Sequence, residues 1–460
     1  MDEWFPLIMF VGTLAFLLCG FPVAFTLSGA ALIFGALGML FDVFDAAFLQ
    51  AIPERMYGLM VNETLLAIPL FVFMGVVLEK SKLAEELLDT MSKAFGGLRG
   101  GLGLSVCLVG GLLAASTGIV GATVVTMGLI SLPSMLSRNY SRPLSTGIIC
   151  ASGTLGQIIP PSIVLIILGD VISSAHQQAQ LAAGNFSPTS VSVGDLFVGA
   201  LIPGCLLMAA YMLYLIGVAV FQPAKVPALP IEERRSLGDP AFLMQILRVL
   251  IPPLLLILGV LGSILTGIAT PTEAASVGSV GAMLLSWKKG QLNRQTLKSV
   301  LHSTMEINAM VFAILIGASI FSLVFRGFAG DELVRDFLLN MEGGRTIAFV
   351  TVMALMFFLG FFLDFFEITF VIVPIVGPIL LQMDMDPIWL GVMIAINLQT
   401  SFLTPPFGFS LFYLRGVAPA SVSTMDIYRG VIPFIFIQLA MLLFLWHFPG
   451  VVMWLPSVVF

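Results

Sequence analysis

The chain has 460 residues, of which 58% are hydrophobic and only 10% are charged, and its formal net charge at pH 7 is -6. Its mean hydropathy of +1.07 is too high for a soluble domain, because no core of that size hides so much apolar surface. Several apolar runs are also long enough to cross a hydrocarbon layer of about 30 Å. The composition therefore predicts an all-α polytopic membrane protein and carries no sign of nucleic-acid binding.

The first apolar run, residues 5–40, is too long for one straight crossing, since about 36 residues form a helix of roughly 54 Å. Gly20-Phe21-Pro22 interrupts the run, so we predict two short helices there. Further apolar runs follow at about 65–79, 103–134, 144–170, 195–221, 242–266, 272–287, 302–325, 346–382, 388–414 and 430–455.

Two of these runs, 103–134 and 346–382, are each too long for a single crossing. Ser116-Thr117-Gly118 interrupts the first, and Asp364 and Glu367 lie near the middle of the second. We therefore predict two re-entrant helical hairpins, each of which enters and leaves the membrane on the same side.

The distribution of basic residues supports this topology. If both hairpins are re-entrant, 16 of the 20 Lys and Arg residues, including every Lys, lie on one face. The other face holds Arg55, Arg326, Arg335 and Arg345, and its connection 171–194 contains neither Lys nor Arg. The lysine-rich face is predicted to be cytoplasmic, which places both termini outside.

The Pro-Pro pair of GTLGQIIPPS (153–162) recurs 245 residues further along the chain, in LQTSFLTPPF (398–407). Each pair follows a predicted hairpin, and the charge map opens the first hairpin to the cytoplasm and the second to the outside. The halves are thus predicted to be one unit in two opposite orientations. Inverted repeats with paired discontinuous helices are typical of secondary transporters whose site lies near mid-membrane.

The repeat divides the chain into four predicted parts. These are N-terminal scaffold helices at 1–62, a first repeat at 63–221, a cytoplasmic linker with central scaffold helices at 222–298, and a second repeat at 299–460. The first repeat holds a hairpin at 103–134 and a broken helix at 144–170. The second holds a hairpin at 346–382, a broken helix at 388–414 and the final span.

The helix breaks offer a site for a small cation. Proline frees backbone carbonyls, and in a membrane those carbonyls need a partner or an aqueous cavity. With neighbouring hydroxyls and amides they form a cage of hard oxygen ligands. The candidates in the first half are Ser116, Thr117, Gly118, Gly121, Thr123, Gly153, Thr154 and Gly156. Those in the second half are Asp364, Glu367, Thr369, Gln399, Thr400, Ser401 and Thr404.

Other roles for these residues stay open. Asp364 and Glu367 can cap a hairpin arm, and polar side chains such as Gln399 can simply join helices. Half-helix N-termini at the same breaks carry partial positive charge and can hold an anion. The sequence contains no HExxH, GxSxG or Walker A motif, so we expect neither an enzyme nor an ATP-binding protein.

Three stretches, LLAIPLFVFMG (65–75), GIATPTEAASVG (267–278) and SFLTPPFGFSLFYLRGVAP (401–419), resemble hallmark segments of the large membrane subunit of tripartite ATP-independent periplasmic (TRAP) transporters. The resemblance covers nearly the whole chain. It implies a sodium-coupled elevator-type transporter in the bacterial inner membrane, with a transport domain that holds both hairpins and moves against a scaffold. It also implies two partners, a small four-helix membrane subunit and a soluble periplasmic binding protein that delivers an organic anion.

The resemblance implies two sodium (Na+) sites, one at Ser116–Thr123 with Gly153–Gly156 and one at Asp364–Thr369 with Gln399–Thr404. Substrate is expected between the hairpin tips, where the candidates are Ser116, Thr117, Gln157, Asp364, Gln399 and Thr400. Glu273 is a family hallmark, for which capping of a scaffold helix is one interpretation. The expected substrate is a carboxylate or a 2-oxo acid. A stand-alone ion-coupled elevator carrier without a binding protein is the alternative, and closed hairpins argue against a passive channel.

Overall fold

The computed structural model describes residues 4–230, 232, 234–235 and 239–459, and every regular element within these ranges is a helix. The chain packs into two compact units, each assembled from three segments. The first unit contains the chain up to Leu66 together with Ile166–Ser192 and Met305–Gly391. The second unit contains Ala67–Leu165, Val193–Thr304 and the chain from Val392 onward. The boundaries of the two predicted repeats stay a prediction, because these units are defined by packing and not by similarity between the two halves of the chain.

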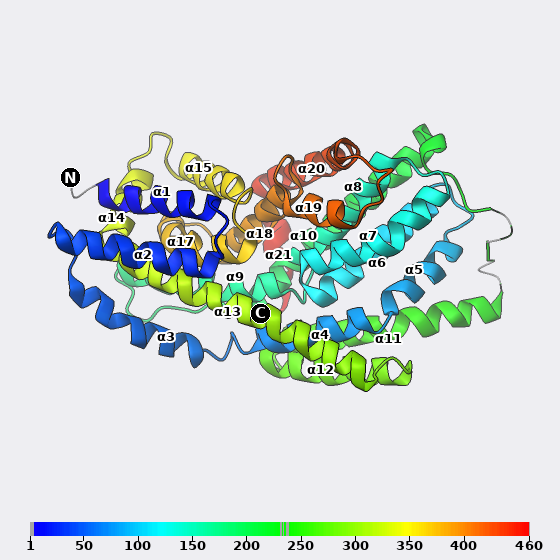
Figure 1. Ribbon diagram of the computed structural model, residues 1–460, viewed down its shortest axis with the longest axis horizontal. Coiled ribbons are helices and arrows are strands. Elements are labelled where there is room, and N and C mark those ends of the chain that lie inside the picture. Colours follow the sequence, from blue (N-terminus) through cyan, green and yellow to red (C-terminus); the bar gives the residue numbers. More distant parts are fainter. Residues whose placement is uncertain (1–3, 231, 233, 236–238, 460) are drawn as a thin grey trace. The chain divides into compact units, whose positions relative to one another are not determined.

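The first unit begins with a pair of apolar helices that lie side by side (Figure 1). Pro22 precedes the second of them, where a continuing helix would lack an N–H donor, so the predicted break in 5–40 is confirmed. The helices of the first unit are α1 (Phe5–Leu18), α2 (Val23–Leu40), η2 (Ala46–Ala51), α3 (Ile52–Met60), α14 (Gly330–Leu339), α15 (Gly344–Leu359), α16 (Phe365–Val371) and α17 (Val373–Gln382), with most of α9 (Ile163–Ala182) and the later part of α13 (Arg294–Gly327).

The predicted hairpin at 346–382 is formed by α15, α16 and α17. The chain turns after Leu359, Asp364 caps the short helix α16, and a 57° bend separates α16 from α17. Because α17 packs back against α15, the segment folds on itself and does not run straight on. The helical hairpin predicted here is thus present, and its re-entry into one side of the membrane stays a prediction.

The second unit is built around α4, α6, α7 and α8 in the first half of the chain and α12 and α20 in the second. Helix α4 packs on α12, α8 packs on α20, and both α6 and α7 pack on α8. Its helices are α4 (Ala67–Lys80), α5 (Leu83–Ala94), α6 (Gly101–Thr117), α7 (Val120–Ser137), α8 (Arg142–Thr154), η3 (Leu155–Gln157), α10 (Val193–Phe221), η4 (Pro223–Lys225), α11 (Pro240–Leu265), α12 (Pro271–Lys288), α19 (Phe409–Val417), α20 (Thr424–His447) and α21 (Gly450–Val459), with the later part of α18 (Pro387–Leu403).

The predicted hairpin at 103–134 is the pair α6 and α7, which lie side by side in Figure 1. Gly118 ends α6 in the left-handed region at φ +62°, which glycine adopts without steric cost. The two arms are joined by two residues only, so the chain returns along its own path. The first predicted helical hairpin is therefore present as well, whereas its re-entry into one side of the membrane stays a prediction.

Both predicted broken helices are present. In the first, α8 ends at Thr154, η3 follows, and α9 starts at Ile163. In the second, α18 ends at Leu403 and α19 starts at Phe409. Each break contains its Pro-Pro pair, Pro160-Pro161 or Pro405-Pro406, joined by a cis peptide bond.

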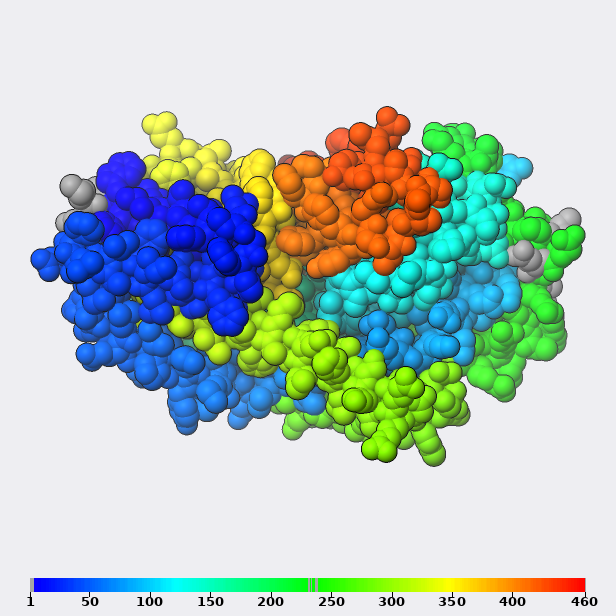
Figure 2. All heavy atoms as spheres, viewed as in Figure 1, coloured from blue at the N-terminus to red at the C-terminus, as the bar shows by residue number. Residues whose placement is uncertain are grey.

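Within the second unit, helices from the two halves of the chain pack so closely that their backbones are in contact. A Cβ on Gly147 of α8 would lie 2.0 Å from the carbonyl oxygen of Gly430 in α20, so neither position has space for a side chain. Figure 2 shows the orange atoms of α19 in direct contact with the cyan atoms of α7. The last helices of the chain thus form one core with the first hairpin and the first broken helix.

Three features differ from the sequence prediction. Helix α9 continues to Ala182, so half of the connection predicted at 171–194 is helical, in keeping with its Gln- and Ala-rich sequence. The final run is two helices, because Phe448-Pro449 separates α20 from α21. The amphipathic helices α3, α5 and α14 lie in segments that we predicted only as connections.

Six helices in the described part of the chain are long and apolar enough to cross a membrane, or seven if the bent pair α16–α17 is counted as one span. They are α2, α7, α10, α11, α13 and α20. The chain is therefore a multi-pass membrane protein, in which α7 is an arm of a hairpin.

Candidate ion and substrate site

The tip of the first hairpin is a buried cluster of hydroxyl groups. Thr117 Oγ1 and Thr123 Oγ1 lie 2.8 Å apart across the tip, and the Ser116 hydroxyl donates to the carbonyl of Leu113 at 2.8 Å. These three hydroxyl side chains are at most 5% exposed. Since a hydroxyl oxygen keeps lone pairs after donating, the tip presents acceptor oxygens away from water.

Three glycines let this tip approach the first broken helix. A Cβ on Gly156 would lie 2.3 Å from the carbonyl oxygen of Ala114, and one on Gly153 would lie 2.4 Å from Val124 Cγ2. A Cβ on Gly118 would lie 2.9 Å from the backbone nitrogen of Ile163, the first residue of α9. The structure therefore brings the two stretches of the predicted first sodium site together.

Gln399 of α18 joins this group from the other half of the chain. Its Nε2 donates to Thr154 Oγ1 at 3.3 Å, and the Thr154 hydroxyl donates to the carbonyl of Ala151 at 2.9 Å. The two residues are 245 positions apart, which is also the separation of the Pro-Pro pairs. The predicted repeats make these two positions equivalent, and a contact between equivalent positions is expected where a pseudo-two-fold axis passes between repeats.

Two buried amide oxygens, one on α18 and one on η3 directly after Thr154, have no hydrogen-bond donor among the described residues. They are Gln157 Oε1 and Gln399 Oε1, on side chains that are 1% and 0% exposed. An unsatisfied buried acceptor costs about 1–3 kcal/mol, and a bound cation would satisfy it. The neighbouring Thr400 and Thr404 hydroxyls donate to their own helix, to Ile396 and Thr400 carbonyls at 2.7 Å each. Gln399, Thr400 and Ser401 are all fully buried.

The tip of the second hairpin carries acids in place of hydroxyls. Asp364 Oδ1 accepts from the Phe365 N–H at 2.6 Å, and Glu367 Oε2 accepts from the Asp364 N–H at 2.9 Å. Together they form a capping box on α16, so the capping role that the sequence allowed is present. Thr369 is fully buried, and its Oγ1 has no hydrogen-bond partner within the described ranges.

The residues predicted for the second sodium site are divided between the two units. Asp364, Glu367 and Thr369 belong to the first, and 399–404 belong to the second. Gln399 contacts Thr154, which the sequence assigned to the other site. The two hairpins likewise belong to different units.

Glu273 has a structural role at the start of α12. Its Oε2 accepts from the Thr270 N–H at 2.8 Å, and its own N–H donates to Thr270 Oγ1 at 3.2 Å. This capping box satisfies backbone donors that a helix start leaves free. It agrees with the interpretation of Glu273 as a helix cap.

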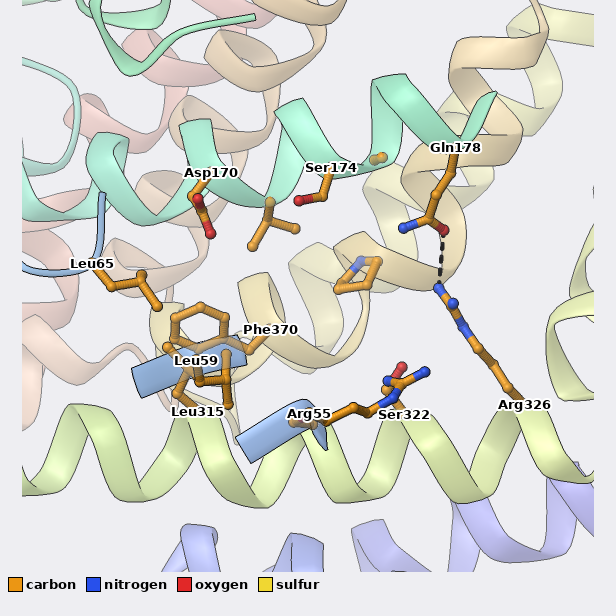
Figure 3. Close-up of a pocket in the computed structure, with 14 residues that line it drawn as sticks. Arg55, Leu59, Leu65, Asp170, Ser174, Gln178, Leu315, Ser322, Arg326 and Phe370 are labelled. Carbon is orange, nitrogen blue, oxygen red and sulfur yellow. Dashed lines mark hydrogen bonds between the residues drawn. The ribbon is translucent and has the colours of Figure 1, made fainter. Parts of the chain in front are cut away.

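The first unit contains a cavity of about 350 Å³ that sequence reasoning missed. Figure 3 shows Arg55 from α3 and Arg326 from α13 in its wall, with Asp170, Ser174 and Gln178 contributed by α9. The sequence feature that could have indicated this cavity is that Arg55 and Arg326 are two of only four basic residues on the predicted outer face. Among the described residues, no three His, Cys, Asp or Glu side chains gather into a metal cluster.

Two helical hairpins, two broken helices and a buried polar centre where the halves of the chain meet define a membrane transporter. Over residues 10–451 the chain matches the family described as "Tripartite ATP-independent periplasmic transporter, DctM component". The chain belongs to this family, whose named relatives are transport permeases and not enzymes.

Several curated relatives align along nearly their whole length. The chain is 28% identical to the C4-dicarboxylate TRAP transporter large permease protein DctM of Pseudomonas aeruginosa, over 92% of each chain. It is 27% identical to the sialic acid TRAP transporter large permease protein SiaM of Vibrio cholerae, over 97% of each. It is 26% identical to the ectoine TRAP transporter large permease protein TeaC of Halomonas elongata, over 98% of this chain and 99% of that protein.

A solved structure has a similar fold. The YdaH transporter of Alcanivorax borkumensis, whose crystal structure is described as having an unusual topology, aligns with a TM-score of 0.63. The alignment covers 97% of this chain and 98% of that one at 14% sequence identity. This likeness concerns the fold alone.

Proposed function

We propose that the chain is the large permease of a sodium-coupled TRAP transporter that carries an organic acid anion across the bacterial inner membrane. Its partners are then the small four-helix membrane subunit and a periplasmic binding protein that delivers the anion. C4-dicarboxylates and sialic acid, which appear in the names of relatives, favour an organic acid as the substrate. The proposed mechanism is an elevator, in which the hairpins carry substrate and sodium together across the membrane.

The observation that carries the proposal is the buried contact between Gln399 and Thr154. It joins positions that the predicted repeats make equivalent. The amide oxygens of Gln399 and of Gln157, which follows Thr154 in η3, have no donor in the described structure. Na+ is a hard cation that prefers oxygen ligands such as amide carbonyls and hydroxyls. We therefore place the coupling ion where the first hairpin tip, the first broken helix and α18 converge.

The second part of the proposal concerns the anion. Neither of the two helix breaks, 155–162 and 404–408, contains an Arg or a Lys. The helix start at Ile163, the tip hydroxyls and the bound cation then supply the positive potential for a carboxylate. Coupling follows, because the anion binds well only when the cation is present.

The test is uptake of a binding-protein-delivered acid into proteoliposomes that contain both membrane subunits. We expect uptake to require an inward sodium gradient and the binding protein. Thr154→Ala should weaken sodium activation about tenfold, which corresponds to the loss of roughly 1.4 kcal/mol of ion binding. Ser401→Ala should weaken it as well, while Thr154→Ser keeps the hydroxyl and serves as the matched control.

Uptake that is equally fast in potassium would contradict sodium coupling. Uptake that does not need the binding protein would favour a stand-alone carrier. Unaltered sodium activation in both alanine variants would remove Thr154 and Ser401 from the ion site.

The proposed orientation places the lysine-rich face in the cytoplasm and both termini in the periplasm. A C-terminal alkaline phosphatase fusion should be active, since this enzyme folds only outside the cytoplasm. A fusion at Lys289, in the predicted cytoplasmic linker, should be inactive and provides the comparison.

A further inference from the structure

The cavity in the first unit is amphipathic. Figure 3 shows Arg326, Ser322 and Gln178 at one end and Leu59, Leu65 and Phe370 at the other, with the head of Arg55 close to Ser322. The proposed ion site uses none of these residues. At about 350 Å³ the cavity is large enough for a small organic molecule.

The two arginines of this cavity lack a counter-ion. The described residues place no Asp or Glu side chain at ion-pair distance from Arg55 or Arg326. Arg326 donates to Gln178 Oε1 at 3.1 Å, but its Nε is buried and has no hydrogen-bond partner among the residues that the structure describes. Burial and the nearby Arg326 guanidinium both lower the pKa of Arg55, so the two groups repel each other. A pair of partly buried like charges with an unused donor is unfavourable until an anion binds.

The acid of the cavity does not neutralise this pair. Asp170 accepts from the side-chain amide of Asn62, with Nδ2 at 3.2 and 3.3 Å from its two oxygens. In Figure 3 it lies near Leu65, at the other end of the cavity from Arg326. A ligand with a second anionic group at that end would meet Asp170 and be repelled.

We propose that this cavity is a binding site for an organic monocarboxylate, whose carboxylate lies between Arg55 and Arg326 and whose apolar part contacts Leu59, Leu65 and Phe370. Arginine suits this role because its planar fork of donors matches a carboxylate. Both arginines belong to the predicted outer face, so the site is one that an anion would reach from outside. That role in transport rests on the proposed function, whereas the binding itself does not.

The experiment measures binding of mandelate to the purified full-length chain by isothermal titration calorimetry in potassium chloride. Mandelate has one carboxylate, one hydroxyl and an apolar ring. We expect saturable binding that mandelamide, the uncharged amide, does not reproduce. Arg55→Gln and Arg326→Gln should each weaken binding at least tenfold, and the corresponding Lys variants should weaken it less. Arg335→Gln, which removes an exposed arginine of α14 outside the cavity, is the matched control and should bind like the parent chain.

A second measurement needs no variant. Phenylglyoxal modifies accessible guanidinium groups, and mass spectrometry of the parent chain gives the extent at each arginine. We expect mandelate to protect Arg55 and Arg326 but not Arg335, and mandelamide to protect none. Binding that is equal in all Arg→Gln variants, equal protection of the three arginines, or full competition by sulfate would each overturn the proposal.

The two proposals fail separately. Sodium-independent uptake with intact mandelate binding would contradict only the proposed function. Sodium-coupled uptake together with mandelate binding that ignores Arg55 and Arg326 would contradict only the cavity site.

Discussion

The two hairpins each turn between apolar helices, and their tips differ in chemistry. The first turns at Gly118 and is closed by the neutral hydroxyl pair Thr117–Thr123. The second is closed by carboxylates, with Asp364 and Glu367 capping the short helix α16. An inverted repeat thus preserves where the chain turns without preserving what its side chains can bind. The first tip suits neutral oxygen ligation, and the second has negative charge available.

The largest effect is expected where the first tip touches the broken helix. Gly156→Ala would place a methyl group 2.3 Å from the backbone oxygen of Ala114, which cannot move as a side chain can. Such overpacking costs about 3 kcal/mol, so the thermal unfolding midpoint of the detergent-purified protein should fall clearly. Gly217→Ala in α10 is the control, because a Cβ there meets nothing within 4 Å. A parent-like midpoint for Gly156→Ala would show that the contact is not formed.

An intermediate effect is expected at the second tip, where capping and charge can be separated. Asp364→Ala should cost about 2 kcal/mol of stability, the upper end for a lost N-cap, because the capping box is partly buried. Asp364→Asn should be nearly as stable as the parent chain, because Asn is also a good N-cap. We expect Asp364→Asn nevertheless to lose sodium-driven uptake, if its charge serves the second ion site. Normal uptake by Asp364→Asn together with reduced stability of Asp364→Ala would assign Asp364 to capping alone.

The smallest effect is expected from the hydroxyl pair of the first tip. Thr117→Val keeps the shape of the side chain but removes the 2.8 Å contact with Thr123, and one such hydrogen bond contributes about 1 kcal/mol. Thr117→Ser should retain most of the stability. The comparison is the difference between the two unfolding midpoints. If Val and Ser behave alike, the pair does not hold the tip closed.

Much of the fold could be predicted from the sequence, because apolar runs and their interruptions are local signals. Helices end at Gly20-Phe21-Pro22 and at the Pro-Pro pairs 160–161 and 405–406, where proline removes an N–H donor and clashes with the preceding turn. Proline alone does not decide this, because Pro252-Pro253 lies inside the continuous helix α11. The helices α3, α5 and α14 were missed because they are amphipathic, short and charged, which resembles a connection when only hydropathy is followed.

The candidate site was predictable only in part. Ser116, Thr117, Gly153 and Thr154 lie at breaks that the sequence displays, and the structure brings them together. The sequence does not reveal which half Gln399 faces, because a polar side chain on a buried helix can point to either repeat. The placement of Arg55 and Arg326 in one cavity could not be predicted either, since it depends on packing between segments far apart in the chain.

The central claim is that the two repeats meet around a sodium ion between Thr154 and Gln399. A cryo-electron-microscopy map of the transporter in lipid nanodiscs, in sodium and again in potassium, tests it most directly. We expect a sodium-dependent density beside Gln399 Oε1 and Gln157 Oε1, with 101–137 and 344–382 each returning to the leaflet that they entered. Either segment passing through both leaflets, or no density at those oxygens in sodium, would contradict it.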